Sequence, residues 1–363
     1  MLIMKLEYKN IVLFLLVMFM FWGCAFSDRV KYSSSIATSI VENRQLVVLN
    51  DTSLWRFPQQ IEMADGFLVV LDEYDNLFFR IYSLDGKPLM GFGNKGQGPG
   101  ELLWVRKFHI SSDKKMMYVF DDMSKKLVEY NLDSLLLGKQ VFREYFVDVK
   151  KMPQSKTPTI LYDMIPLSEQ SFLVKANHDE LRYGIFDTTN KKITPIYHSF
   201  LEEGLGITSK EEIWSLFSSS TFTKLSPNKS KLVNVTYIGG IIEIFSVDGQ
   251  RNDISLTNHS FIYEPVYGLA EGAIPPYVIH NEKTQFGFED ICVTDKMIYA
   301  VLHDVGEQLK PTFITIFDWE GNIQKRIEVG KRINKICVDE CNGRMYLLVS
   351  NEENGYELDV MIL

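Results

Sequence analysis

The stretch that decides the fold is FLVVLDEYDNLFFRIYSLDGKPLMGFG, which runs from Phe67 to Gly93. It reads as an apolar strand, a short polar turn, a second strand, an Asp-Gly turn and a third strand. Asp85 and Gly86 give a strong two-residue hairpin signal, because glycine adopts positive φ at no steric cost. The apolar runs are rich in β-branched and aromatic residues, which favour strands over helices. The stretch therefore predicts a small antiparallel sheet.

The same pattern returns five more times along the chain, in copies that begin near Met116, Ser171, Lys231, Met297 and Arg344. Another short apolar run precedes the first strand of several copies, as in KFHIS, DICVT and KICVD, which gives four strands per unit. Repeated four-stranded antiparallel units bury both faces against their neighbours when they close into a ring. The sequence therefore predicts an all-β fold, a six-bladed β-propeller.

The two ends of the repeat array are complementary, because one lacks a strand and the other has a strand to spare. The sixth unit stops at Leu363 after its third strand, whereas the strand-like segment Arg44–Asn50 precedes the first unit and has no partner of its own. If this N-terminal strand completes the sixth blade, it closes the ring and removes an exposed sheet edge. We expect residues 44–363 to form the propeller domain.

A glycine-rich loop, GFGNKGQGPGEL from Gly91 to Leu102, contains the G-x-G-x-x-G pattern of a dinucleotide site. Such a site needs a helix after the glycines, so that the helix N-terminus faces the pyrophosphate. Here β-branched and aromatic residues follow instead. We interpret the loop as the link from the outer strand of one blade to the inner strand of the next, with Glu101 accepting backbone N–H bonds. No cofactor is predicted.

The first 23 residues have the pattern of a signal peptide. Lys5 and Lys9 precede an unbroken apolar run of about a dozen residues, Ile11 to Gly23. A bilayer-spanning helix needs about twenty apolar residues, whereas the core of a signal peptide needs about 7–15. The chain is therefore expected to be exported.

Cys24 follows this run and resembles the lipid-carrying cysteine of bacterial lipoproteins. Gly23 fits the lipobox, but Phe21 and Trp22 depart from it. The resemblance implies a lipoprotein-type signal peptide over residues 1–23, a lipid on Cys24, and a tether over residues 24–43. An uncleaved anchor and an ordinary signal peptide are the alternatives.

A second resemblance covers Gly91 to Asp133, which is similar to an NHL-type propeller repeat. Tyr118–Val119, Asp121 and Val128–Tyr130 fill the family positions, where the acid usually caps a turn. The wider chain resembles the six-bladed β-propeller lipoproteins, with NHL- or TolB-like repeats, of Gram-negative envelopes. That resemblance implies a lipid-anchored protein at the outer membrane or on the periplasmic side.

Composition and motifs exclude several function classes. The chain has 38 basic and 47 acidic residues, a net charge of −9, and no segment concentrates Lys or Arg, which argues against a nucleic-acid partner. The six histidines are scattered, and no H-E-x-x-H, G-x-S-x-G or calcium-loop pattern occurs. We predict no catalytic residue and no metal ligand.

Three cysteines remain after Cys24, namely Cys292, Cys337 and Cys341. An odd number in an exported chain argues against a disulfide framework. Cys292 and Cys337 have similar surroundings in the sequence, so we expect free thiols at equivalent strand positions. A Cys337–Cys341 bridge is the alternative.

Function is expected on the face where outer strands connect to the next inner strands. Two of these connections are long, namely Ser199–Phe222 and Thr257–Phe286. The first is expected to contain a short helix, in which Ser209 and Glu212 have capping-box spacing. Long loops of this kind usually carry function, and we expect them to form a rim around the channel mouth. The candidate ligand-binding residues are the aromatic Trp104, Tyr263, Tyr267 and Tyr277 and the charged Arg106 and Glu289.

Two function classes follow, and a purely structural subunit is a weaker third. The favoured one is a non-catalytic module, anchored in the envelope by its lipid, that binds a glycan, a peptide or a partner protein. The alternative is a metal-dependent hydrolase or lyase, as in lactonase-like six-bladed propellers, whose ligands come from separate blades and leave no local motif. The aromatic candidates have an alternative role of their own, which is to pack the loops down.

Overall fold

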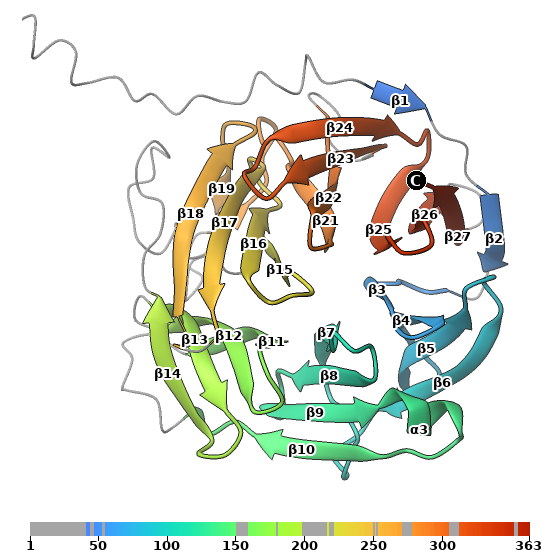
Figure 1. Cartoon of the computed structure of the whole chain (residues 1–363), viewed down its shortest axis with the longest axis vertical. Coiled ribbons are helices and arrows are strands. Elements are labelled where there is room, and N and C mark those ends of the chain that lie inside the picture. The colour runs from blue at the N-terminus through green and yellow to red at the C-terminus, as the bar shows by residue number, and fades with distance from the viewer. Residues whose placement is uncertain are drawn as a thin grey trace, which may run out of the picture.

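Six sheets stand around a common axis in a computed structural model of the chain (Figure 1). The all-β, six-bladed propeller predicted from the sequence is confirmed. The structure describes residues 41–43, 47–52, 55–149, 159–178, 181–197, 216–217, 221–249, 251, 253–270, 278–304, 312–351 and 355–363.

Each blade is an antiparallel sheet whose strands follow one another from the axis outward. The first blade contains β3 (Gln60–Met63), β4 (Phe67–Tyr74), β5 (Leu77–Ser83) and β6 (Pro88–Asn94). The second contains β7 (Val105–Ile110), β8 (Met116–Asp121), β9 (Lys126–Asn131) and β10 (Phe142–Phe146), with the short helix α3 (Leu132–Leu136) between its last two strands. The third contains β11 (Ile160–Pro166), β12 (Ser171–His178), β13 (Leu181–Asp187) and β14 (Lys192–Tyr197).

The remaining three blades repeat this order. The fourth contains β15 (Thr221–Leu225), β16 (Lys231–Thr236), β17 (Ile241–Asp248) and β18 (Asp253–Phe261). The fifth contains β21 (Phe288–Val293), β22 (Met297–Leu302), β23 (Phe313–Asp318) and β24 (Ile323–Glu328). The sixth contains β25 (Arg332–Asp339), β26 (Arg344–Asn351) and β27 (Gly355–Ile362).

The N-terminal segment closes the ring. Strand β2 (Val47–Thr52) pairs antiparallel with β27 and supplies the fourth strand of the sixth blade. The predicted closing strand is confirmed, with its described part starting three residues later than Arg44. A further strand that the sequence did not predict, β1 (Val41–Asn43), pairs parallel with β24 of the fifth blade. The segment ahead of the first blade therefore pairs with two successive blades.

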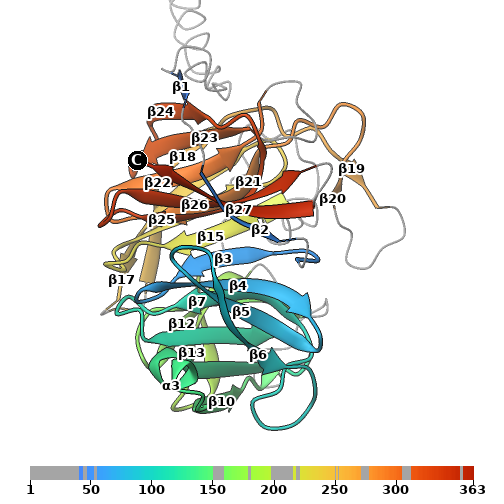
Figure 2. The ribbon, with the colours of Figure 1, turned by 90° about the vertical axis from the view of Figure 1, so that its right-hand side faces the viewer.

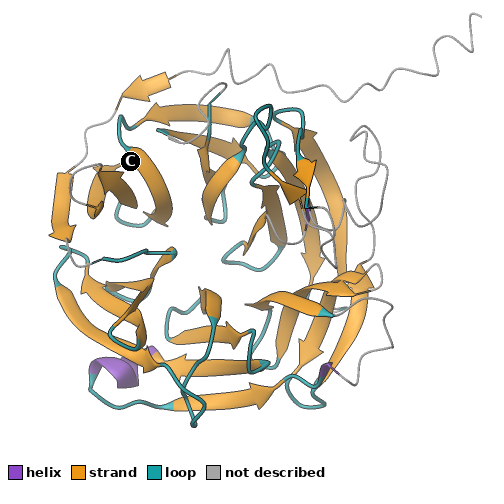
Figure 3. Ribbon diagram, turned by 180° about the vertical axis from the view of Figure 1, so that it is seen from behind, coloured by secondary structure: helices purple, strands orange, loops and turns teal. Residues whose placement is uncertain are grey.

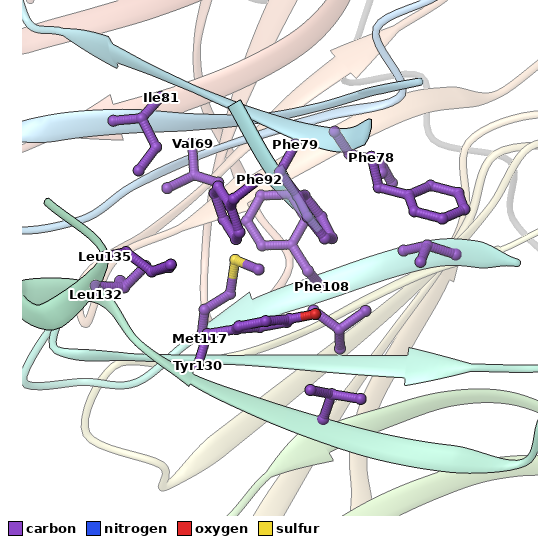
Figure 4. Close-up of a cluster of buried hydrophobic side chains, with 14 of the residues drawn as sticks. Val69, Phe78, Phe79, Ile81, Phe92, Phe108, Met117, Tyr130, Leu132 and Leu135 are labelled. Atoms are coloured by element: carbon purple, nitrogen blue, oxygen red, sulfur yellow. The ribbon is translucent and has the colours of Figure 1, made fainter. Parts of the chain in front are cut away.

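Apolar clusters fill the spaces between neighbouring blades, because each sheet buries both faces. Figure 4 shows the cluster between the first and second blades. The ring centroid of Phe79 lies 5.1 Å from that of Phe92 and 5.5 Å from that of Phe108. Burying one such side chain contributes about 1.5–3 kcal/mol, so the inter-blade clusters are the main source of stability.

The glycine-rich loop turns the chain, as predicted. It leads into strand β7 rather than a helix, and Gly93, Gly96 and Gly100 have positive φ. The Glu101 carboxylate accepts the Gly98 N–H at 2.8 Å, and Glu144 of β10 accepts the Gly100 N–H at 2.7 Å. These amides already have carboxylate partners, so they do not form a phosphate cradle.

The three cysteines of the propeller are free thiols, and the alternative Cys337–Cys341 bridge is not formed. Cys292 pairs with Tyr299 and Cys337 with Tyr346, in the first strand pair of successive blades. Their predicted equivalence is confirmed. The signal peptide, the lipidation residue Cys24 and the tether up to residue 40 lie outside the described residues. Within the described ranges, no helix is long and apolar enough to cross a membrane.

Candidate functional site

The innermost strands β3, β7, β11, β15, β21 and β25 all begin on one face of the disc, which we call the loop-rich face. This follows from the topology, because every outer-to-inner connection returns the chain to that face. The two-residue strands β19 (Gly268–Leu269) and β20 (Val278–Ile279) pair with each other and project from it (Figures 2 and 3). Side chains at the starts of the inner strands therefore converge around the axis here.

Two chambers lie around the axis, one toward each face. The front chamber opens at the loop-rich face and has a volume of about 230 Å³; the rear chamber has about 170 Å³. His109 and Lys224 line both. The front chamber is lined by Phe57, Pro58, Gln59, Gln60, Arg106, Lys107, His109, Phe222, Thr223, Lys224, Glu289, Asp290, Asn334, Lys335 and Tyr356.

Charged contacts between inner strands lie between the two chambers. The Lys224 ammonium on β15 is paired with the Glu62 carboxylate on β3, in the opposite blade. His109 Nε2 lies 2.7 Å from Asp163 Oδ1, which links the second blade to the third. Burial alone would raise the pKa of Asp163, but the neighbouring His109, Lys107 and Lys175 hold it below its ordinary value. These contacts fix the inner strands relative to one another.

Two further lysines approach one aromatic ring in the front chamber. The Nζ atoms of Lys107 and Lys335 each lie 5.4 Å from the ring centroid of Phe222, within cation–π range. Lys107 also donates to the Thr221 carbonyl at 3.2 Å, and burial lowers its pKa. Among the described residues, no carboxylate lies within ion-pair distance of Lys107.

The acidic side of the chamber comes from β21. The Glu289 carboxylate lies 3.3 Å from His303 Nε2 and 3.9 Å from Lys335 Nζ. Asp290 accepts the Ile336 N–H at 2.9 Å, and burial raises the pKa of its carboxyl group. Both acids are therefore already engaged by groups of the fifth and sixth blades.

Aromatic side chains stand at the mouth of the front chamber. The Phe57 side chain is 63% exposed, and its ring meets that of Tyr356 edge to face at 6.2 Å. An exposed ring beside polar groups provides a surface on which a flat apolar group can stack. The mouth therefore combines an apolar surface with a charged interior.

The structure brings two of the six candidate binding residues together in the front chamber. Arg106 lines it with a half-exposed side chain that pairs with Asp122 at 3.3 Å, and Glu289 lines it on the other side. Trp104 is 48% exposed but does not line the chamber. Its backbone N–H donates to Asp121 at 3.2 Å, and Asp121 caps this turn as the repeat pattern implied.

The tyrosine candidates take other positions. Tyr263 is buried and its hydroxyl donates to the His303 carbonyl at 2.6 Å, while the half-buried Tyr267 packs on the apolar cluster that contains Ile238. Tyr263 packs its connection against the fourth and fifth blades, and Tyr267 packs it against the fourth, which was their alternative role. Tyr277 lies outside the described residues.

The two long connections are described in part. The helix expected at Ser209–Glu212 lies outside the described residues. The segment Thr257–Phe286 was expected to be a long loop, but its first five residues belong to strand β18, which ends at Phe261. In the parts of the chain that the structure describes, no three or more metal-ligating side chains come together.

The sequence reasoning missed the chamber lysines Lys107, Lys224 and Lys335. Each is a single lysine within a short strand, in VRKFHI, TFTKL and RINKICVD. A single lysine within the inner strand of every second repeat, the second, fourth and sixth, was the signal that could have revealed them. An isolated lysine suggests an exposed position until the strands are placed around one axis.

Comparisons with known proteins agree with this fold. Residues 37–341 match the family described as TolB-like 6-blade propeller-like. No curated protein matches the chain. A member of the DUF4221 family from Bacteroides vulgatus is 12% identical with a TM-score of 0.55, over 89% of this chain and 97% of that one. A Bacteroides fragilis protein thought to be exported is 10% identical with a TM-score of 0.50, over 89% and 99%.

Proposed function

The chain belongs to the TolB-like six-bladed propeller family, and on this basis we propose that it is a ligand- or partner-binding module of the cell envelope. In this proposal, the signal sequence directs export, the lipid on Cys24 holds the chain at the membrane, and the loop-rich face is presented outward. The ligand is a glycan, a peptide or a partner protein. The front chamber receives the part of the ligand that enters deepest.

One observation carries the proposal: the front chamber opens on the face where all the inter-blade connections lie. A ligand at this mouth touches side chains from several blades at once. Binding sites are typically concave, partly apolar and provided with a few convergent polar groups. The ion pair of Lys224 with Glu62 and the inter-blade clusters support the mouth, so its shape is set before a ligand arrives.

A matched pair of bulky substitutions tests this site. Gln59→Trp fills the mouth of the front chamber, and Ser112→Trp places the same ring at the rear chamber. The purified proteins are applied to glycan and peptide arrays and used to capture partners from an envelope extract. We expect Gln59→Trp to lose at least tenfold in binding and Ser112→Trp to retain it, both with wild-type circular dichroism. Equal effects of the two substitutions would contradict the proposal.

Elemental analysis of the same samples addresses the metal-dependent hydrolase. If a divalent ion is bound one to one and its removal abolishes the hydrolysis of a lactone or ester, the chain is an enzyme rather than a binding module. The membrane anchor has its own test. Cys24→Ser should abolish labelling by a radioactive fatty acid and release the protein from the membrane fraction, and continued labelling would contradict the anchor.

A further inference from the structure

The front chamber carries more positive than negative charge, although the chain as a whole has a net charge of −9. Four cationic side chains line it and only two carboxylates, those of Glu289 and Asp290. A cleft with an excess of one charge raises the local concentration of ligands of the opposite charge. The cationic side chains of the chamber are Arg106, Lys107, Lys224 and Lys335.

The contacts of these cations show which of them are available. Lys224 is paired with Glu62, and Arg106 with Asp122 at the outer edge. Lys335 has a long contact with the Glu289 carboxylate, at 3.9 Å, and a 3.4 Å hydrogen bond to the Glu289 carbonyl. Lys107 donates to a carbonyl and faces the Phe222 ring. Lys107 is therefore the cation of the chamber that pairs with no carboxylate among the described residues. Lys335 lies beside the same ring.

The two carboxylates of the chamber do not form an ion pair with Lys107. Glu289 is shared between His303 and Lys335, and Asp290 accepts a backbone N–H of the sixth blade. Burial lowers the pKa of Lys107, and the neighbouring acids Asp163 and Asp290 compensate this effect only in part. A bound anion would supply the rest of that compensation.

Size and shape limit the ligand. A volume of about 230 Å³ lies below the roughly 300–1,000 Å³ of typical drug-sized ligand pockets. Phe57 and Tyr356 offer an apolar surface at the entrance, and Gln59 and Asn334 line the walls. This lining suits a small group that combines one negative charge with polar atoms and one flat apolar face.

We propose that the front chamber binds a carboxylate or phosphate group carried by a small sugar-like molecule or by the end of a longer chain, held between Lys107 and Lys335 beside Phe222. This inference rests on the proposed binding function and specifies the chemistry of its ligand. The anion approaches through the mouth formed by Phe57 and Tyr356. Its charge is neutralised by side chains of the second and sixth blades.

The probes are glucuronate and glucose 6-phosphate, with glucose as the neutral control, in calorimetric titration of the full propeller at two salt concentrations. We expect both anions to bind, more weakly at the higher salt, and glucose to bind at least tenfold more weakly. Lys107→Met and Lys335→Met should each weaken anion binding about tenfold or more. The matched control Lys229→Met, in the rear chamber, should change it less than twofold.

An oligosaccharide that ends in glucuronate separates the two sources of the anion. Tighter binding of the oligosaccharide indicates a chain end, and tighter binding of the monosaccharide indicates a free small molecule. Equal binding of glucose and glucuronate, equal effects of the three lysine substitutions, or no anion binding at millimolar concentration would overturn the inference. If Gln59→Trp still abolished array binding in that case, the binding function would stand with a neutral ligand.

Discussion

Lys224 on β15 forms an ion pair with Glu62 on β3, which joins the inner strands of two opposite blades across the axis. The two side chains are 18% and 20% exposed. Burial alone would lower the pKa of Lys224, but the carboxylates of Glu62 and Asp290 raise it above its ordinary value. Glu62 also accepts a hydrogen bond from Gln60 at 2.8 Å. Gln60 therefore holds Glu62 in place, and the nearby Asp290 stabilises the charge of Lys224.

Removing both partners of this pair should destabilise the propeller less than the two single losses added together. We expect Glu62→Gln or Lys224→Met alone to reduce the free energy of unfolding by about 3 kcal/mol, because each leaves a mostly buried charge without its partner. The double variant should lose less than the sum, with a coupling energy of about 1–3 kcal/mol. Urea unfolding of the four proteins measures the coupling. Additive losses would show that the two side chains do not stabilise each other.

The carboxyl groups of Asp163 and Asp290 should titrate on opposite sides of the ordinary aspartate pKa of 3.8. Burial raises the pKa of Asp290, whereas His109 and two lysines outweigh burial at Asp163 and lower its pKa. The stability contributed by Asp163 is therefore present above pH 3.8 and is lost as the pH falls through its lower, folded-state pKa. Carboxyl-carbon NMR, assigned with Asp163→Asn and Asp290→Asn, measures both titrations. The reverse order would contradict the network of contacts.

The fold could be predicted because its signals are local and repeated. The run Phe67–Gly93 contains three strands and two turns, and apolar runs buried on both faces recur with it in every blade. Even the ring closure followed from a count of strands. Strand β1 was missed because the three residues Val41–Asn43 are too few to show a period of two.

The front chamber could not be predicted in the same way, because it exists only between strands far apart in the sequence. Lys107 and Lys335 are separated by more than half of the chain, and nothing near either residue indicates that both approach Phe222. Tyr263 presents a different difficulty. Its aromatic, proline-rich surroundings are equally typical of a binding loop and of a connection that is packed down.

Two glycines with similar backbone angles should respond differently to alanine. Gly100 has φ +73°, and an added Cβ would lie 2.7 Å from an atom of the Phe142 ring; Gly138 has φ +72° and open space around it. We expect Gly138→Ala to cost about 1 kcal/mol for the left-handed backbone. Gly100→Ala should cost about 2–4 kcal/mol, since overpacking adds to the backbone term. Thermal unfolding compares them, and equal losses would show that the loop can move away from Phe142.

The three free thiols should react at very different rates. Cys341 is exposed and Cys337 is buried; the hydrogen bond with Cys292, together with burial, raises the pKa of the Cys337 thiol well above its ordinary value. Since the thiolate is the reactive species, iodoacetamide at pH 8 should modify Cys341 first. Peptide mass spectrometry over time gives the order. Cys341→Ser should leave only slow labelling, and fast labelling of Cys337 would show that the inner strands open readily.

Three N-terminal truncations separate the contributions of β1 and β2. A chain that begins at residue 41 keeps both strands, one that begins at residue 47 loses β1, and one that begins at residue 55 loses both. Loss of β2 removes the backbone pairing with β27 and uncovers the cluster that contains Leu358. At about 0.5–1.5 kcal/mol for each hydrogen bond, we expect this chain to be about 3 kcal/mol or more less stable than the chain that begins at residue 41.

The chain that begins at residue 55 should also associate, because β27 becomes an unpaired edge strand. The chain that begins at residue 47 should remain monomeric to the same degree as the longest one and lose about 1 kcal/mol, since β1 contributes only three paired residues. Light scattering and urea unfolding measure both properties. If removing β2 changed neither, the ring would be held by the inter-blade clusters alone, and the N-terminal strand would be a cover for the edge rather than the closure of the fold.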